Sequence, residues 1–249
     1  MTPPLGAKNW PYPRWIAHRG AGKLAPENTL AAFRLGAEHG YRMFECDVKL
    51  SADEIPFLLH DANLERTTTG SGVGGKLSWQ ELSQLDAGSW HSPAYVGEPI
   101  PSLSDVVGFC LAGGHALNVE IKPTPGTASR TGKVVADHLA ATWMGDSPPP
   151  LLTSFEPAAL EAAKLAQPQL PRGLLLASFW PGWREAAQGL ECVAVVANHL
   201  LWTESSVGAA KQAGYRLLSY TVNEVSAVDK LLALGTDGII TDRIDLFVP

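Results

Sequence analysis

Side chains able to transfer protons, hold a metal or bind a phosphate stand where apolar runs end in the first half of the chain. They are His18, Arg19, Glu45, Asp47, His60, Glu120 and Lys122. Such groups are often catalytic when a rigid strand presents them to solvent. Together they suit cleavage of a phosphate ester, which needs proton transfer and positive charge beside the phosphate.

The acidic residues of this set predict a metal site. Glu45 and Asp47 are two residues apart on an expected strand, so their carboxylates point to one face and Cys46 to the other. Carboxylates this close raise each other's pKa unless a positive charge lies between them. Glu120, on the next expected barrel strand, could complete a site for Mg²⁺, Ca²⁺ or Mn²⁺. The alternative is a solvated strand end that carries two charges.

The two histidines predict general acid and base catalysis near neutral pH. Phosphodiester cleavage uses both roles, because the attacking oxygen loses a proton while the departing alkoxide gains one. The alternative for His60 is a metal ligand or a core histidine bonded to Asp61. Asp242, which ends the last apolar run, is left open between a site residue and a polar cap.

The basic residues could bind the phosphate. Arg19 offers a planar fork for two phosphate oxygens, and Lys122 places an ammonium two residues after Glu120. The alternative for Lys122 is a salt bridge to Glu120, and both roles are compatible.

The elements that must position these residues alternate regularly. Strands are expected near residues 15, 43, 117, 151, 173, 192, 216 and 238, and the second of them is expected to run from Tyr41 to Asp47. A first helix is expected to start at Pro26 to Thr29 and stop at Gly40, and later helices at 103–112, 130–142, 157–166, 183–188, 204–213 and 224–233. This alternation predicts an α/β fold with a parallel sheet covered by helices.

Two architectures fit this pattern, a closed (β/α)8 TIM barrel and an open doubly wound sheet. The turn from Gly20 to Ala25 lacks the third glycine of the dinucleotide-binding fingerprint. The length of 249 residues is usual for a barrel.

Residues 61–101 lack the regular alternation of strands and helices, which predicts a small insertion after strand 2. We therefore expect residues 1–249 to form a single barrel domain, led by an extended segment at 1–14.

Composition limits the partners. The formal charge of −6 and the lack of a Lys/Arg cluster argue against a nucleic-acid surface. No apolar segment approaches the ~20 residues of a membrane span, and the first residues lack the pattern of a secretory signal. Three widely spaced cysteines in apolar contexts predict buried thiols in a reduced, cytoplasmic protein. The expected partner is a small-molecule substrate, with no prediction of oligomeric state.

The chain resembles the glycerophosphodiester phosphodiesterase family in an ordered set of motifs. They are His18-Arg19-Gly20, Pro26-Glu27-Asn28-Thr29, Glu45-Cys46-Asp47-Val48, His60-Asp61, Leu64-Glu65-Arg66-Thr67-Thr68, Pro99-Ile100-Pro101-Ser102-Leu103, Glu120-Ile121-Lys122, Tyr220-Thr221-Val222-Asn223 and Gly235-Thr236-Asp237-Gly238-Ile239-Ile240-Thr241-Asp242. The resemblance implies a barrel with an insertion after strand 2. It also implies a divalent cation on Glu45, Asp47 and Glu120, His18 and His60 as the acid/base pair, and Arg19 and Lys122 on the phosphate.

The activity implied by the resemblance is metal-dependent hydrolysis of glycerophosphodiesters, such as glycerophosphocholine or glycerophosphoethanolamine, to glycerol 3-phosphate and an alcohol. The alternatives are a barrel phosphodiesterase for lysophospholipids or phosphoinositides, and an inactive module that binds glycerophosphodiesters. Tyr220 stands where many relatives carry tryptophan. Phe155, Trp180 and Trp202 are further candidates for the apolar wall of the site.

Overall fold

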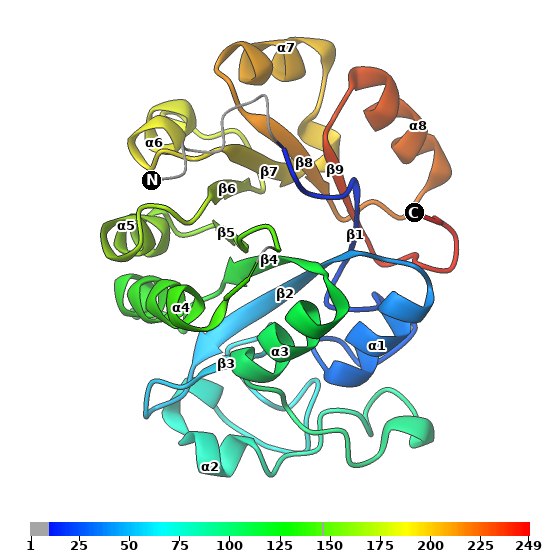
Figure 1. Cartoon of the computed structure of the whole chain (residues 1–249), viewed down its shortest axis with the longest axis vertical. Coiled ribbons are helices and arrows are strands. Elements are labelled where there is room, and N and C mark those ends of the chain that lie inside the picture. Colours follow the sequence, from blue (N-terminus) through cyan, green and yellow to red (C-terminus); the bar gives the residue numbers. More distant parts are fainter. Residues whose placement is uncertain (1–9, 146) are drawn as a thin grey trace.

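The computed structural model describes residues 10–145 and 147–249, and it shows a closed barrel of eight parallel strands with helices outside it (Figure 1). The barrel strands are β1 (Trp15–Ala17), β2 (Met43–Leu50), β4 (Ala116–Ile121), β5 (Leu151–Ser154), β6 (Arg172–Leu176), β7 (Ala194–Asn198), β8 (Arg216–Tyr220) and β9 (Gly238–Thr241). They pair in that order, and β1 closes the ring by pairing with both β9 and β2. The predicted TIM barrel is confirmed, and residues 1–9 of the expected lead-in lie outside the described residues.

The helices between the strands lie close to where the sequence predicts them. They are α1 (Leu30–Glu38), α3 (Leu103–Gly113), α4 (Ala128–Thr142), α5 (Pro157–Ala166), α6 (Trp183–Gly189), α7 (Glu204–Gln212) and α8 (Val225–Leu234). Thr29 caps α1, because its Oγ1 accepts a hydrogen bond from Ala32 N at 3.2 Å. Across the described part of the chain, every helix is too short or too polar to cross a bilayer.

Strand β2 shows how one sequence serves both faces of the barrel wall. Phe44, Cys46 and Val48 pack into the apolar cluster beneath the surrounding helices. The alternate residues, which include Glu45 and Asp47, therefore face the barrel interior. These two carboxylates are only 3% and 1% exposed. The alternative of a solvated strand end is thus wrong.

Strand β2 ends at Leu50 rather than at Asp47, where the sequence placed its end. The reason is a hairpin, since residues 48–50 pair antiparallel with β3 (Pro56–Leu58). Glu54 turns the chain between them with φ of +65°. The hairpin carries His60 to the same end of the barrel as the carboxylates of β2.

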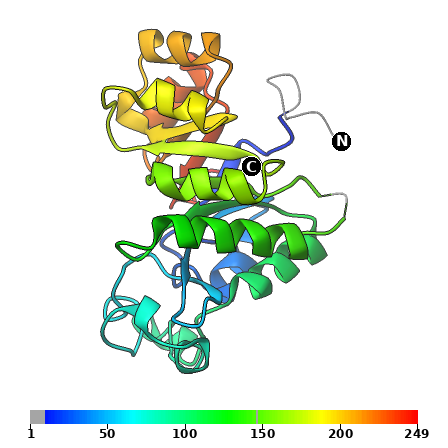
Figure 2. The same cartoon turned by 90° about the vertical axis from the view of Figure 1, so that its left-hand side faces the viewer.

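The insertion after the hairpin forms its own small core. It contains two 3-10 turns, η1 (Gly74–Lys76) and η2 (Pro93–Tyr95), and the short helix α2 (Trp79–Leu82). Leu64, Leu82 and Ile100 bury their side chains together there. The insertion, cyan in Figures 1 and 2, projects from one end of the molecule. Glu98 fastens it to the barrel, because its Oε1 accepts a hydrogen bond from Ala31 N at 2.9 Å.

The close packing of α1 on the loop after β1 predicts a site for a destabilising substitution. A Cβ on Gly36 would lie 2.2 Å from the carbonyl oxygen of Gly20, which directly follows Arg19. We expect Gly36→Ala to lower the free energy of unfolding by about 1–3 kcal/mol, because the backbone must move to admit the methyl group.

Denaturant unfolding of Gly36→Ala beside Gly108→Ala checks this expectation. A Cβ on Gly108, in α3, would meet nothing within 4 Å. That control should be neutral or slightly more stable, because alanine favours a helix over glycine. Equal stability of the two variants would contradict the packing argument.

Candidate active site

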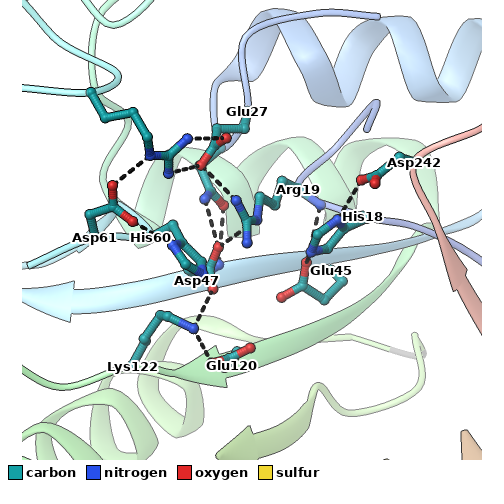
Figure 3. Close-up of polar contacts among 12 residues, drawn as sticks. His18, Arg19, Glu27, Glu45, Asp47, His60, Asp61, Glu120, Lys122 and Asp242 are labelled. Atoms are coloured by element: carbon teal, nitrogen blue, oxygen red, sulfur yellow. Dashed lines mark hydrogen bonds and ion pairs between the residues drawn. The ribbon is translucent and has the colours of Figure 1, made fainter. Parts of the chain in front are cut away.

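The structure brings all seven predicted residues to the carboxyl ends of the barrel strands (Figure 3), the end at which TIM barrels carry their active sites. His18 and Arg19 follow β1, Glu45 and Asp47 lie within β2, His60 follows β3, Glu120 lies within β4, and Lys122 follows it. A cavity of about 210 Å³ opens there and is lined by all of these residues except Asp47. Asp47 is buried and contacts Arg19 and Lys122, which both line the cavity.

Two aromatic residues form a wall of the cavity. The rings of Phe155 and Tyr220 meet edge to face, with centroids 5.7 Å apart. The Tyr220 hydroxyl donates to the carbonyl oxygen of Leu176 at 3.0 Å. The prediction of Phe155 as a wall residue is confirmed. The same prediction is wrong for Trp202 and Trp180. Trp202 is fully buried in the core, and Trp180 does not line the cavity.

The three acidic residues form a compact cluster. Oxygens of Glu45, Asp47 and Glu120 lie within 4.8 Å of one another. Burial, reinforced by the charge of Asp47, raises the pKa of Glu45 to about 8. Burial and Asp47 also raise the pKa of Glu120, although Lys122 opposes this. With all three carboxylates ionised, the cluster would carry more negative charge than its surroundings offset, and a divalent cation would relieve that repulsion.

Asp47 differs from its two neighbours because it has cationic partners. Burial alone would raise its pKa, but Arg19 and Lys122 hold the pKa well below its usual range. Arg19 Nε lies 3.1 Å away and Lys122 Nζ 3.5 Å away. Asn28 adds two hydrogen bonds, since its Nδ2 donates to Asp47 Oδ2 at 2.9 Å and its Oδ1 accepts from Asp47 N at 3.1 Å.

His18 is held by a second carboxylate. Its Nδ1 lies 2.6 Å from Asp242 Oδ1, while its Nε2 faces Glu45 Oε2 at 3.8 Å. Burial lowers the pKa of His18, but the Asp242 hydrogen bond and the Glu45 charge outweigh burial and raise it. Asn223 Nδ2 holds the other Asp242 oxygen at 2.9 Å. Asp242, left open between a site residue and a polar cap, is therefore a site residue, because it contacts His18.

His60 has a similar partner but the opposite shift. Its Nδ1 lies 2.7 Å from Asp61 Oδ1. Burial lowers the pKa of His60, because the attraction of Asp47 is too weak to offset it. The contact with Asp61 is the one that the alternative of a core histidine required. His60 nevertheless lines the cavity, so this contact is compatible with a catalytic role.

The two cations contact carboxylates and also line the cavity. Arg19, at φ of +51°, donates from its backbone N to Glu45 Oε2 at 3.1 Å and from Nη1 to Glu27 Oε1 at 2.8 Å. Lys122 Nζ donates to Glu120 Oε1 at 2.7 Å and lies 5.7 Å from the Phe155 ring centroid. The predicted Lys122 salt bridge is thus present, and its ammonium still borders the cavity.

Sequence reasoning assigned no role to several polar residues that hold the site. Glu27, Asn28 and Asn223 lie in motifs that were noted for resemblance alone. Lys49, two residues beyond Asp47 on the same strand face, is 2% exposed and donates from Nζ to the carbonyl oxygen of Lys122 at 2.8 Å. The repeated spacing of two from Glu45 to Lys49 is the signal that could have found it.

Comparison with known proteins identifies the family of this chain. Residues 18–246 match the model of the Glycerophosphoryl diester phosphodiesterase family. The chain belongs to this family and is a glycerophosphodiester phosphodiesterase. The Bacillus subtilis (strain 168) protein YhdW is 32% identical over 242 residues, which cover 94% of this chain and 96% of that protein.

Two further relatives support the assignment to glycerophosphodiester phosphodiesterases. The glycerophosphodiester phosphodiesterase of Caldanaerobacter subterraneus is 30% identical over 232 residues, which cover 91% of this chain and 93% of that protein. Among solved structures, an Oleispira antarctica phosphodiesterase in complex with the product sn-glycerol-3-phosphate has a TM-score of 0.88 and 37% identity, covering 93% of each chain.

The Asp242 contact predicts how His18 titrates. Replacing Asp242 by asparagine removes a negative charge and a charged hydrogen bond, so we expect Asp242→Asn to lower the pKa of His18. NMR titration of the His18 ring in chelator measures the shift. Asp245→Asn, which removes a carboxylate paired with Arg243 in the same loop, should leave the His18 pKa unchanged. An unaltered His18 pKa in Asp242→Asn would contradict the assignment.

Proposed function

We propose that this enzyme hydrolyses glycerophosphodiesters, such as glycerophosphocholine or glycerophosphoethanolamine, to glycerol 3-phosphate and an alcohol. The observation that carries the proposal is the placement of two carboxylate-held histidines, two cations and an acidic cluster around one cavity. The product bound by the Oleispira antarctica relative supports the substrate class.

The acidic cluster is the proposed site of one divalent cation, Mg²⁺ or Ca²⁺, with Mn²⁺ as a further candidate. The donors are all carboxylate oxygens, which suits these hard cations. The raised pKa values of Glu45 and Glu120 support the fit, because a bound cation would offset the charge that raises them. When bound, the cation would neutralise phosphate charge and polarise the attacking oxygen.

The cations of the chain are the proposed phosphate ligands. Lys122 uses one N–H for Glu120, and an ammonium has three donors, so Lys122 can also bind a phosphate oxygen. Arg19 is held on two sides by Glu27 and Asp47, which restricts the motion of its guanidinium beside the cavity. Preorganised donors of this kind stabilise charge that develops in the transition state.

The histidines are the proposed proton carriers. The Asp242 hydrogen bond raises the pKa of His18 and burial lowers the pKa of His60, so His18 holds a proton more readily than His60 does. Acid and base roles in one cleavage step need one group that gives a proton and one that accepts it. One histidine accepts the proton of the attacking oxygen, and the other protonates the departing alkoxide.

Substitution of either histidine tests this assignment. We expect His18→Ala and His60→Ala each to lower kcat by ~10²–10⁴-fold, because proton transfer to or from the reacting oxygens is lost. Steady-state kinetics on glycerophosphocholine measure the loss. His39→Ala, which changes an exposed histidine at the end of α1, serves as the control and should retain activity. Near wild-type turnover in His18→Ala or His60→Ala would exclude that histidine from proton transfer.

The raised pKa of Glu45 predicts the pH dependence of stability without metal. The folded state holds the Glu45 proton up to about pH 8, whereas the unfolded chain releases it near its ordinary value of 4.5. The contribution is therefore complete below the unfolded pKa and is lost as pH rises through about 8. In chelator, we expect the free energy of unfolding to fall more steeply from pH 5 to 8 in the wild type than in Glu45→Gln.

The same variants test cation binding without an activity assay. At pH 8, a cation at 100 times its dissociation constant should stabilise the wild type by about 2.7 kcal/mol and Glu45→Gln by much less. Urea unfolding with Mg²⁺, Ca²⁺ or Mn²⁺ measures this difference. Glu185→Gln, an exposed substitution on α6, should behave like the wild type in both experiments. Equal responses of wild type and Glu45→Gln would exclude Glu45 as a ligand.

A further inference from the structure

A turn in the insertion presents one arginine to the site. Thr68 closes the turn, because its backbone N and its Oγ1 both donate to the Leu64 carbonyl oxygen, at 3.0 and 2.8 Å. Leu64 and Thr67 are buried, whereas the Arg66 side chain stays 44% exposed. Burial of its neighbours thus fixes the position from which Arg66 extends.

The Arg66 guanidinium joins two carboxylates through three hydrogen bonds. Its Nε donates to Asp61 Oδ2 at 2.5 Å. Its Nη1 and Nη2 donate to the two oxygens of Glu27, at 2.9 and 2.8 Å. This forked arrangement fixes direction as well as charge, which a single ammonium cannot reproduce.

Each of these carboxylates in turn holds a residue that lines the cavity. Asp61 Oδ1 lies 2.7 Å from His60 Nδ1, and Glu27 Oε1 accepts from Arg19 Nη1 at 2.8 Å (Figure 3). Arg66 therefore links the histidine after β3 to the arginine after β1.

His60 and His18 are each held by a carboxylate that has a polar partner of its own, but the partners come from different parts of the chain. Asp242, the partner of His18, is held by the neutral amide of Asn223, from the loop after β8. Asp61, the partner of His60, is held by a cation from the insertion. The orientation of His60 thus depends on a segment outside the repeating barrel units.

We propose that Arg66 is a positioning residue that holds Asp61 so that this carboxylate keeps the His60 ring in one tautomer and one orientation. The insertion is then a working part of the active site. This inference rests on the proposed function, because the orientation of His60 affects turnover only if His60 carries a proton. Loss of an outer partner that orients a metal ligand typically costs 10–100-fold in activity, and we expect a comparable loss for a partner that orients a proton-transferring histidine.

A double-mutant cycle between Arg66 and Asp61 tests the proposal. We expect Arg66→Met to lower kcat by about 10–100-fold. KM should change less, since the Glu27 hydrogen bond to Arg19 remains. If Arg66 acts through Asp61, the Arg66→Met/Asp61→Asn variant should be no slower than the slower single variant. Losses that multiply would overturn the proposal.

The tautomer of His60 gives a readout that does not depend on turnover. Nitrogen NMR should show one ring tautomer in the wild type, with the proton on Nδ1, and a mixture in Arg66→Met. Arg66→Lys keeps the charge without the fork, so it should stay impaired in both readouts. It also carries the test if Arg66→Met does not fold. Wild-type kcat with an unchanged tautomer in Arg66→Lys would overturn the proposal.

A control separates this inference from general effects and from the proposed function. Arg130→Met removes another exposed arginine, which pairs with Glu54 and does not line the cavity, and it should retain wild-type kcat. Wild-type turnover in His60→Ala would refute the role of His60 itself. Loss of turnover in His60→Ala, combined with losses that multiply in the Arg66 and Asp61 cycle, would refute only the role of Arg66.

Discussion

The burial of three carboxylates inside one end of the barrel is the constraint on which the rest of the site depends. Removing a charge from water costs several kcal/mol unless a partner compensates it. Asp47 has such partners, and its pKa falls, whereas Glu45 and Glu120 have too few, and theirs rise. The uneven compensation makes ionisation of Glu45 and Glu120 costly, and a bound cation would lower that cost.

The residues around the cluster are placed so that they stabilise the buried carboxylates. Arg19 takes a left-handed backbone conformation, which directs its N–H to Glu45 while its guanidinium lies beside Asp47. The Lys122 ammonium contacts Glu120, and buried Lys49 holds the Lys122 carbonyl oxygen. Arg19 and Lys122, the two cations that stabilise the buried charge, therefore also line the cavity. The contacts of Arg19 and Lys122 with the carboxylates thus stabilise the fold and also position these two cations at the cavity.

The sequence was sufficient to predict the barrel and to predict that seven polar residues gather at one end of it, because both predictions follow local rules. Alternating apolar runs and helical patterns predict the strands and helices, and the spacing of Glu45 and Asp47 predicts that both point one way. Motif resemblance added the order of the functional residues. These signals lie within short stretches, so a single sequence contains them.

The contacts that hold the site could not be predicted because they join distant stretches. Asp242 meets His18 only because β9 pairs with β1 in the closed barrel. Arg66 meets Glu27 only because the insertion folds back over the loop after β1. The end of β2 was likewise misplaced, since its last residues are held by the hairpin with β3. Long-range pairing decides each of these cases.

The most direct test of the account is to identify the products formed from glycerophosphocholine by the wild-type enzyme, with a divalent cation and again after exhaustive chelation. The account predicts glycerol 3-phosphate and choline in equal amounts with the cation, and no turnover after chelation. Release of phosphocholine and glycerol, or turnover that survives chelation, would contradict it.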